Sequence, residues 1–444
     1  MLLRQVFYRK KLVRAVFLAL ALFSGGLSAV SALDVPLRKI ADDSALRRKL
    51  FDPWFIEAPS RVLSKAKRLE TLPDGARIEV RTERERGEFG IVLARESGGA
   101  FSGWTQGSWV VTRNVESGAL LRIRFFPRSD PYTYIQFRPL DGGRSLMDAV
   151  AYGAYLAQSA SVPLSFERLL TASLRDILHV ADNRELFRYF EPEPENYAGI
   201  RTLVTRLRQR LPELSFADDG AINENGDYVF INTLMPQTEP YGLNCSGFAK
   251  WLVDGLLLPV TGSRLPISML KQPYGERGSS LTRPYESLRD PFFGLDWTRN
   301  LAAAANAAIK SPAFAVLDEI EVRESPFSQI IVRKGGTSRT EPYTGFLPDA
   351  GFAVKGLPSL LYALAIDEPG VIYLGAVNAE MLPKPRMRQY FHIAAFLPYF
   401  DGDGVFHVAV FESAAETSFS RFVARYPENY INLVRLPSET IFEP

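Results

Sequence analysis

The 444-residue sequence is poor in cysteine and histidine, with one cysteine and three histidines. A single cysteine excludes an internal disulfide, and no close-spaced cysteine or histidine pair suggests a zinc site. Glycine-rich nucleotide-binding motifs are also missing, so we expect neither a metal nor another cofactor. Beyond the N-terminus no apolar run reaches the ~20 residues that a bilayer requires, so we expect no membrane span in the mature chain.

The first 32 residues have the pattern of an export signal. Five basic residues and no acidic ones precede a short apolar run at 15–23, and small residues follow up to Val30-Ser31-Ala32. We therefore predict a cleaved signal peptide at 1–32 and a periplasmic or secreted protein. Removing five of the 52 basic residues leaves 47 against 50 acidic ones, a net charge of −3. This balance gives no reason to expect a nucleic-acid partner.

The mature chain is expected to be an α+β protein that begins with a mixed β-rich and helical accessory region at 33–212. Short alternating runs predict strands at about 76–140, and helical spacing of apolar residues predicts helices at about 144–212. An acidic, proline-containing stretch at 191–195 marks the approach to a domain boundary.

The second half, 213–444, opens with a predicted hairpin at 221–231 that turns at Asn225-Gly226. A tract at about 256–365 is rich in proline, glycine, arginine and serine, and it predicts a long insertion of loops with one alanine-rich helix at 298–310. Strand-like runs follow at 370–374, 391–396 and 404–411.

The lone cysteine lies where a helix is expected to begin. Phe248, Trp251 and Leu252 have the i, i+3, i+4 spacing of a helix, and Asn244 is a suitable N-cap. A helix N-terminus favours the thiolate and offers backbone N–H groups to an oxyanion. A free thiol in an oxidising compartment has to be either buried or used, and Cys245 is therefore the candidate nucleophile.

Two of the histidines lie in strand-like runs that flank a turn. Asp-Gly pairs at 401–404 predict a hairpin that brings His392 and His407 onto adjacent strands. One histidine is then available as the base and the other as the group that orients it. Glu412 is a rival orienting group, although its odd spacing from His407 places it on the other strand face. His179 lies in a helical run and is expected to be an ordinary surface or core residue.

Residues 244–248 (Asn-Cys-Ser-Gly-Phe) resemble the Asp-Cys-Ser-Gly-hydrophobic motif of the NlpC-type cell-wall cysteine peptidases, which belong to the papain-like group with the CHAP amidases. Residues 391–396 and 368–372 resemble that family's histidine strand and the strand before it. The resemblance implies a papain-like C-terminal domain, in which the cysteine helix packs on an antiparallel sheet. It also implies Cys245 as nucleophile, His392 as base and His407 as orienter, acting on peptidoglycan stem peptides or a similar amide.

In that reading the Cys245 backbone N–H holds the oxyanion, with Tyr241 and Ser246 as further candidates at the oxyanion or cleft. The sequence departs from the family pattern because Asn244 and Val371 stand where aspartates are usual, and because 147 positions separate Cys245 from His392. These departures favour an alternative, a non-catalytic envelope binding or scaffolding protein that keeps a papain-like frame. A thiol-dependent acyltransferase is a third possibility, because it uses the same thioester.

Overall fold

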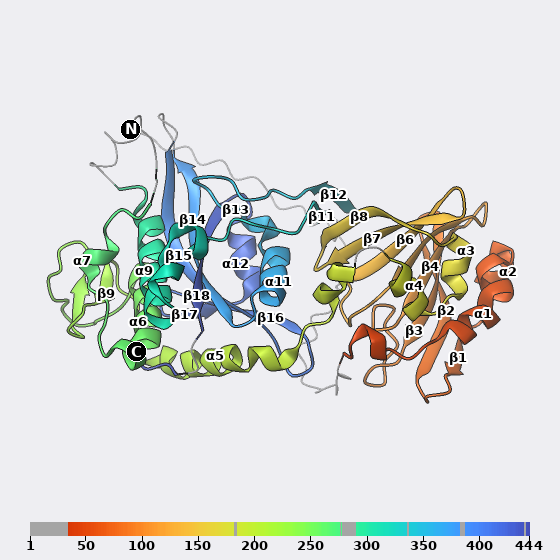
Figure 1. Cartoon of the computed structure of the whole chain (residues 1–444), viewed down its shortest axis with the longest axis horizontal. Coiled ribbons are helices and arrows are strands. Elements are labelled where there is room, and N and C mark those ends of the chain that lie inside the picture. Colours follow the sequence, from red (N-terminus) through yellow and green to blue (C-terminus); the bar gives the residue numbers. More distant parts are fainter. Residues whose placement is uncertain are drawn as a thin grey trace, which may run out of the picture.

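The computed structural model describes residues 34–444 except 182–183, 276, 278–289, 335–336, 382–386 and 439–440. The predicted signal peptide at 1–32 lies outside the described residues. The described chain is an α+β protein built on two large antiparallel sheets, one in each half (Figure 1). None of the helices in these ranges is long and apolar enough to cross a membrane.

The N-terminal half is a ten-stranded sheet whose first eight strands follow one another in chain order. The strands are β1 (Arg68–Thr71), β2 (Arg77–Glu85), β3 (Glu88–Arg95), β4 (Trp109–Asn114), β5 (Leu120–Phe125), β6 (Tyr134–Leu140), β7 (Arg144–Ala151) and β8 (Ala154–Val162). The predicted strands at 76–140 are confirmed. Apolar side chains alternate along them, so one face of the sheet joins the main core.

The prediction of helices from residue 144 is wrong for 144–162, which form β7 and β8. The two strands are joined by a tight turn at Tyr152 and Gly153, both with positive φ (46° and 86°). Such a turn matches the twist of a hairpin, but Tyr-Gly carries little of the usual sequence signal. Helices do follow, as α3 (Phe166–Thr171), α4 (Leu174–Val180) and α5 (Ala198–Arg210).

Short helices cover the core-facing side of the N-terminal sheet. They are α1 (Ser44–Leu50), the π-helical turn η2 (Phe51–Ile56), α2 (Pro59–Leu63) and α3. Leu50, Phe55 and Val62 are fully buried in the same core as the strand residues Ile91 and Ile123. This burial of apolar surface stabilises the packing of residues 44–63 against the N-terminal sheet.

The C-terminal half contains a six-stranded antiparallel sheet in the order β13-β18-β14-β15-β16-β17. Its strands are β13 (Phe352–Ala353), β14 (Val371–Met381), β15 (Met387–Phe400), β16 (Phe406–Glu412), β17 (Ala415–Thr417) and β18 (Tyr430–Pro437). Helices α6 (Cys245–Thr261) and α9 (Phe293–Ile309) lie on one face, and α11 (Leu357–Asp367) and α12 (Phe419–Arg425) on the other (Figure 1). The predicted hairpin at 221–231 is present as β9 (Gly220–Ile222) and β10 (Tyr228–Phe230).

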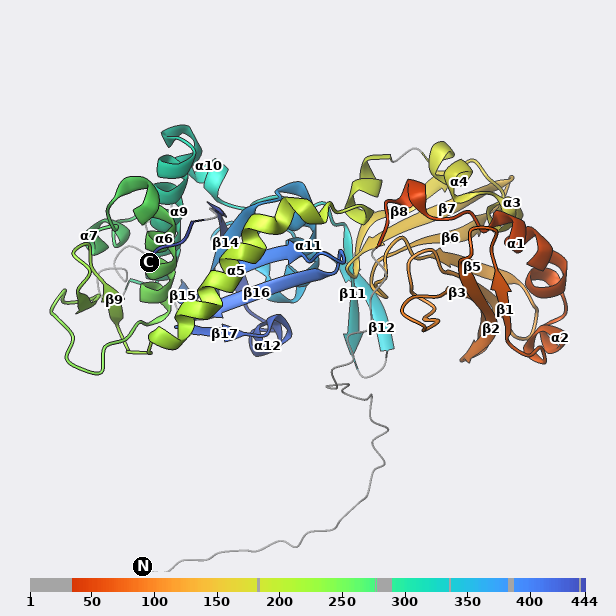
Figure 2. The same cartoon turned by 90° about the horizontal axis from the view of Figure 1, so that it is seen from below.

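The tract at 256–365 contains more regular secondary structure than the predicted insertion of loops. It holds the end of α6, α7 (Ile267–Leu270), α9, α10 (Leu317–Ile320) and the start of α11. It also holds the hairpin β11 (Gln329–Lys334) and β12 (Thr337–Pro342), which extends the N-terminal sheet by pairing with β8 (Figure 2). The tract therefore contributes to the packing of both halves and joins them.

Candidate active site

Cys245 is the first residue of α6, as the sequence predicts. The Asn244 side chain caps the helix, because its Oδ1 accepts the Gly247 N–H at 2.8 Å. By the geometry of a helix start, the N–H groups of Cys245 and Ser246 have no acceptor within the helix. Cys245 is half-buried. Because it begins the helix, its side chain lies at the end where these backbone donors stabilise negative charge.

The start of α6 is held tightly against strand β9. Asn244 donates its N–H to the Gly220 carbonyl at 3.0 Å. A Cβ at Gly247 would lie 2.0 Å from the same carbonyl oxygen, so no larger residue fits there. On the other side, Trp297 Nε1 of α9 donates to the Ser246 carbonyl at 2.9 Å. These contacts fix the position of the sulfur relative to the sheet.

His392, on β15, faces the sulfur. Its imidazole and the backbone N–H of Ile393 both lie close enough to the Cys245 side chain to lower the pKa of the thiol. The Ser246 hydroxyl lies 4.0 Å from the sulfur as a further polar neighbour. The structure therefore brings together the predicted nucleophile and the predicted base.

Glu412, at the end of β16, completes this group. His392 Nε2 lies 2.6 Å from Glu412 Oε2, so Nδ1 is the ring nitrogen left for the sulfur. The other carboxylate oxygen, Oε1, accepts hydrogen bonds from Thr417 Oγ1 at 2.6 Å and Arg425 Nη1 at 2.7 Å. The carboxylate is buried and both of its oxygens form hydrogen bonds, which fixes the orientation of the His392 ring.

The electrostatics of the three residues favour a charged pair. Burial would raise the pKa of the Cys245 thiol, but the hydrogen bond and charge of His392 outweigh it and hold this pKa below its usual value. Burial would lower the pKa of His392, but the bonds to Cys245 and Glu412 raise it to about 9. Burial would raise the pKa of Glu412, but its bonds to His392 and Thr417 bring it to about 2. All three shifts favour the charged forms, a thiolate, an imidazolium and a carboxylate.

His407 is not the orienting group, and that prediction is wrong. It pairs with Tyr399, seven residues along β15 from His392, which is about 23 Å at ~3.3 Å per residue. Its ring bonds Asp401 at 2.8 Å and is 43% exposed. Glu412 instead follows Phe411, which pairs with Ala395, so it lies beside Ala394 on the same face as His392. The odd spacing that separates Glu412 from His407 is thus what places Glu412 at the site.

The other residues considered in the sequence analysis differ in how they lie relative to the Cys245 sulfur. Ser246 is buried directly beside the sulfur. Tyr241 is exposed and stacks on Tyr228, with ring centroids 5.3 Å apart. His179 is an exposed residue in the last turn of α4. Within the described ranges, no cluster of three or more histidine, cysteine or acidic residues is arranged to hold a metal ion.

The sequence reasoning did not identify the residues that α12 and its flanks bring to the site. The centroid of the Tyr426 ring lies 5.8 Å from that of His392 and 6.0 Å from that of Phe391, whose side chain is exposed. Of the partners of Glu412, Thr417 is the last residue of β17, just before this helix, and Arg425 is the last residue of the helix itself. No local motif marks them, because their role depends on how α12 packs against β16.

Comparison with known families matches about a third of the chain, within its first half. Residues 36–186 match a family model described as a domain of unknown function, DUF8515. No curated protein and no solved structure matches the chain. Cys245, His392 and Glu412 all lie outside the matched segment.

Replacing Gly247 by alanine is expected to disturb the site from within the backbone. The new Cβ would lie 2.0 Å from the Gly220 carbonyl, so α6 and β9 must separate. We expect a loss of about 3 kcal/mol or more in unfolding free energy, measured by urea denaturation, and slower alkylation of Cys245. Gly402→Ala is the matched control, because nothing lies within 4 Å of its Cβ. Equal stability of the two variants would show that β9 does not constrain the helix start.

Proposed function

We propose that this protein is an exported cysteine hydrolase that cleaves an amide bond through Cys245, His392 and Glu412. The observation that carries the proposal is the arrangement of the His392 ring, which adjoins the Cys245 side chain and bonds Glu412 Oε2 at 2.6 Å. A nucleophile, a base and a group that orients the base form the usual arrangement for covalent catalysis by a thiol.

In the acylation step the Cys245 thiolate attacks the carbonyl carbon, and the carbonyl electrons move to oxygen. The N–H groups at the start of α6 are placed to hold this oxyanion. The His392 imidazolium gives its Nδ1 proton to the amide nitrogen, the C–N bond breaks, and the amine leaves. Glu412 stabilises the positive charge on the ring before this transfer.

In the deacylation step neutral His392 takes a proton from water, and the hydroxide formed attacks the thioester carbon. The C–S bond breaks, the acid product leaves, and the thiolate–imidazolium pair is restored. The same thioester would pass to an amine acceptor in an acyltransferase. The products therefore distinguish hydrolysis from transfer.

We further infer a papain-like C-terminal domain related to the NlpC-type enzymes, with peptidoglycan stem peptides as the substrate. Support comes from the order of the functional residues and from the placement of the cysteine helix against the strand that carries the histidine. The Asn-Cys-Ser-Gly motif and the predicted export signal agree with an enzyme of the cell envelope.

The alternative is an envelope scaffold that keeps this frame without catalysis. Its sequence support is the absence of aspartate at Asn244 and Val371. Asn244 nevertheless performs the capping role that an aspartate would have there. Cys245, His392 and Glu412 supply the nucleophile, the base and the orienting group that the thiol mechanism needs. The hydrolase is therefore the better supported proposal.

Alkylation kinetics test whether Cys245 is activated. We expect iodoacetamide to label Cys245 rapidly at pH 7, because its pKa is lowered by His392. His392→Ala should slow labelling by about tenfold or more, since one pKa unit already corresponds to a tenfold change in thiolate when the pKa exceeds the pH. His407→Ala is the control and should leave the rate unchanged. Slow labelling of the unmodified protein, as of a buried thiol, would favour the scaffold.

The pH dependence of cleavage tests the role of Glu412. Since the pKa of His392 is about 9, kcat/KM should fall as pH rises through about 9, where the imidazolium proton needed by the leaving amine is lost. Glu412→Gln removes the negative charge that stabilises the imidazolium, so the alkaline limb should move to lower pH and kcat should fall. An alkaline limb that stays near pH 9 in this variant would show that Glu412 does not set the pKa of His392.

Muropeptides test the substrate. We expect the purified mature chain to release shortened stem peptides, detected by mass spectrometry, and Cys245→Ala to release none. Products extended by an added amine would identify an acyltransferase. If muropeptides stay intact while Cys245 labels rapidly, the substrate assignment is wrong and the thiol chemistry stands.

A further inference from the structure

A β-bulge lies in β15 immediately before the candidate base. Val377 of β14 pairs with His392, and Asn378 pairs with Tyr390, so Phe391 has no partner on β14. Bulges of this kind change the direction of a side chain and are common next to active sites. Phe391 is 43% exposed, whereas its neighbour Tyr390 is buried. The bulge therefore presents an aromatic ring to solvent beside His392.

The bulge also brings two consecutive side chains to one neighbour. Consecutive residues of a regular strand point to opposite faces of the sheet. Here the rings of Phe391 and His392 both lie next to Tyr426, with centroids 6.0 Å and 5.8 Å from its own. Phe391 and Tyr426 are thus two aromatic side chains that border the candidate base, and we call them the Phe391–Tyr426 pair.

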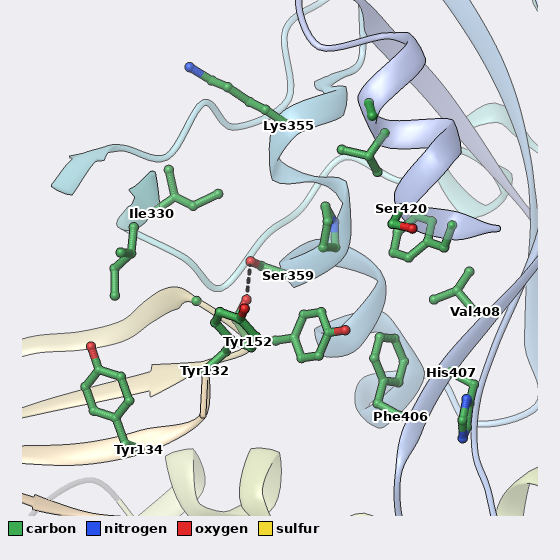
Figure 3. Close-up of a pocket in the computed structure, with 16 residues that line it drawn as sticks. Tyr132, Tyr134, Tyr152, Ile330, Lys355, Ser359, Phe406, His407, Val408 and Ser420 are labelled. Carbon is green, nitrogen blue, oxygen red and sulfur yellow. Dashed lines mark hydrogen bonds between the residues drawn. The ribbon is translucent and has the colours of Figure 1, made fainter. Parts of the chain in front are cut away.

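The Tyr426 ring is held in place by the core under α12. It makes an edge contact with Phe422, which is fully buried, and the two ring centroids are 5.1 Å apart. Ser420 and Val423 of the same helix line a cavity of about 680 Å³ at the junction of the two halves (Figure 3). Neither Phe391 nor Tyr426 lines that cavity. The Phe391–Tyr426 pair therefore belongs to the candidate active site and not to the junction.

The charges around the Phe391–Tyr426 pair balance one another. The Arg425 guanidinium carbon lies 5.6 Å from the centroid of the Tyr426 ring, and Arg425 bonds Glu412 at 2.7 Å. His392 bonds the same carboxylate at 2.6 Å. In their charged forms these two cations are matched by Glu412 and the Cys245 thiolate. An ionic group placed against the rings would lose hydration without gaining an unpaired countercharge, so the surface favours an apolar group.

The position of the pair beside His392 indicates which part of a substrate it meets. In the proposed acylation step His392 gives its proton to the leaving amine, so the amide nitrogen must lie within hydrogen-bond reach of this ring. Phe391 and Tyr426 border the same ring, whereas the oxyanion donors lie at the start of α6. The side chain of the residue that supplies the amine is therefore the part of the substrate nearest the pair.

We propose that Phe391 and Tyr426 form a specificity subsite that takes an apolar side chain on the residue supplying the leaving amine. The inference rests on the proposed function and adds to it the chemical class of one substrate residue. A single exposed phenylalanine is ordinary on a protein surface. This one is turned by a bulge toward the ring that borders the candidate base, which is the placement that a specificity residue needs.

Thiocarbamoylation of Cys245 tests the subsite in the full mature chain. The thiolate adds to the carbon of an isothiocyanate, R–N=C=S, and the nitrogen takes a proton, so R stands where the leaving residue would stand. Each rate is divided by that of the same reagent with N-acetylcysteine. We expect benzyl isothiocyanate to be favoured over methyl isothiocyanate about tenfold or more, which is ~1.4 kcal/mol of differential contact. The anionic 3-carboxypropyl isothiocyanate should not be favoured.

Variants of Phe391 test whether this ring is the cause. Phe391→Ala should lower the benzyl preference about fivefold or more, a loss of ~1 kcal/mol, and Phe391→Tyr, which keeps the ring, should restore it. Phe391→Gln is a second variant in case the alanine variant does not fold, and thermal midpoints verify folding. Phe314→Ala is the matched control, because Phe314 is 44% exposed in η6 (Pro312–Ala315), beyond the end of α9. It should keep the full preference.

An unchanged benzyl preference in a folded Phe391→Ala or Phe391→Gln variant overturns the subsite, as does the absence of any benzyl preference in the unmodified protein. An equal preference for 3-carboxypropyl or glucopyranosyl isothiocyanate overturns the assignment of an apolar group. Failure of the proposed function gives a different result, in which methyl isothiocyanate reacts with Cys245 no faster than with N-acetylcysteine. The ratio of the benzyl and methyl rates still decides the subsite in that case.

Discussion

The hydrogen bond between His392 Nε2 and Glu412 Oε2, at 2.6 Å, determines what the lone cysteine is able to do. It commits one ring nitrogen to the carboxylate and leaves the other for the sulfur. Burial would raise the pKa of Glu412, but the bonds from His392, Thr417 and Arg425 lower it to about 2, so its charge is retained. That charge favours the imidazolium, and the imidazolium in turn favours the thiolate.

Local signals predict local structure well in this chain. The helix that begins at Cys245, its Asn244 cap and the hairpin turn at 401–404 all follow from short patterns. The partner of His392 cannot be predicted from short patterns, because the register of a hairpin depends on which residues close the turn. Two histidines on adjacent strands are neighbours only if they are paired in the strand register. Here His407 pairs with Tyr399, seven residues from His392.

The ten-stranded sheet shows a second limit of local reasoning. The family match ends at residue 186, yet the sheet is completed by β11 and β12, more than 140 residues further along. The matched segment therefore does not contain the whole sheet. The sequence predicts loops where the β11–β12 hairpin lies, because the pairing of β11 with β8 is non-local and leaves no signal in nearby residues. Tyr152, in the β7–β8 turn, stacks on Tyr362 of α11 at 5.5 Å, so the same edge joins the two halves.

The departure from aspartate at Asn244 has a physical reading that favours catalysis. An aspartate at the N-cap would place a negative charge one residue from the thiolate and raise its pKa, whereas asparagine caps Gly247 without charge. The buried Glu412 supports the same conclusion. Burying a carboxylate costs desolvation energy, and a scaffold gains little from holding it with His392, Thr417 and Arg425. For an activated thiol, that carboxylate is what stabilises the imidazolium.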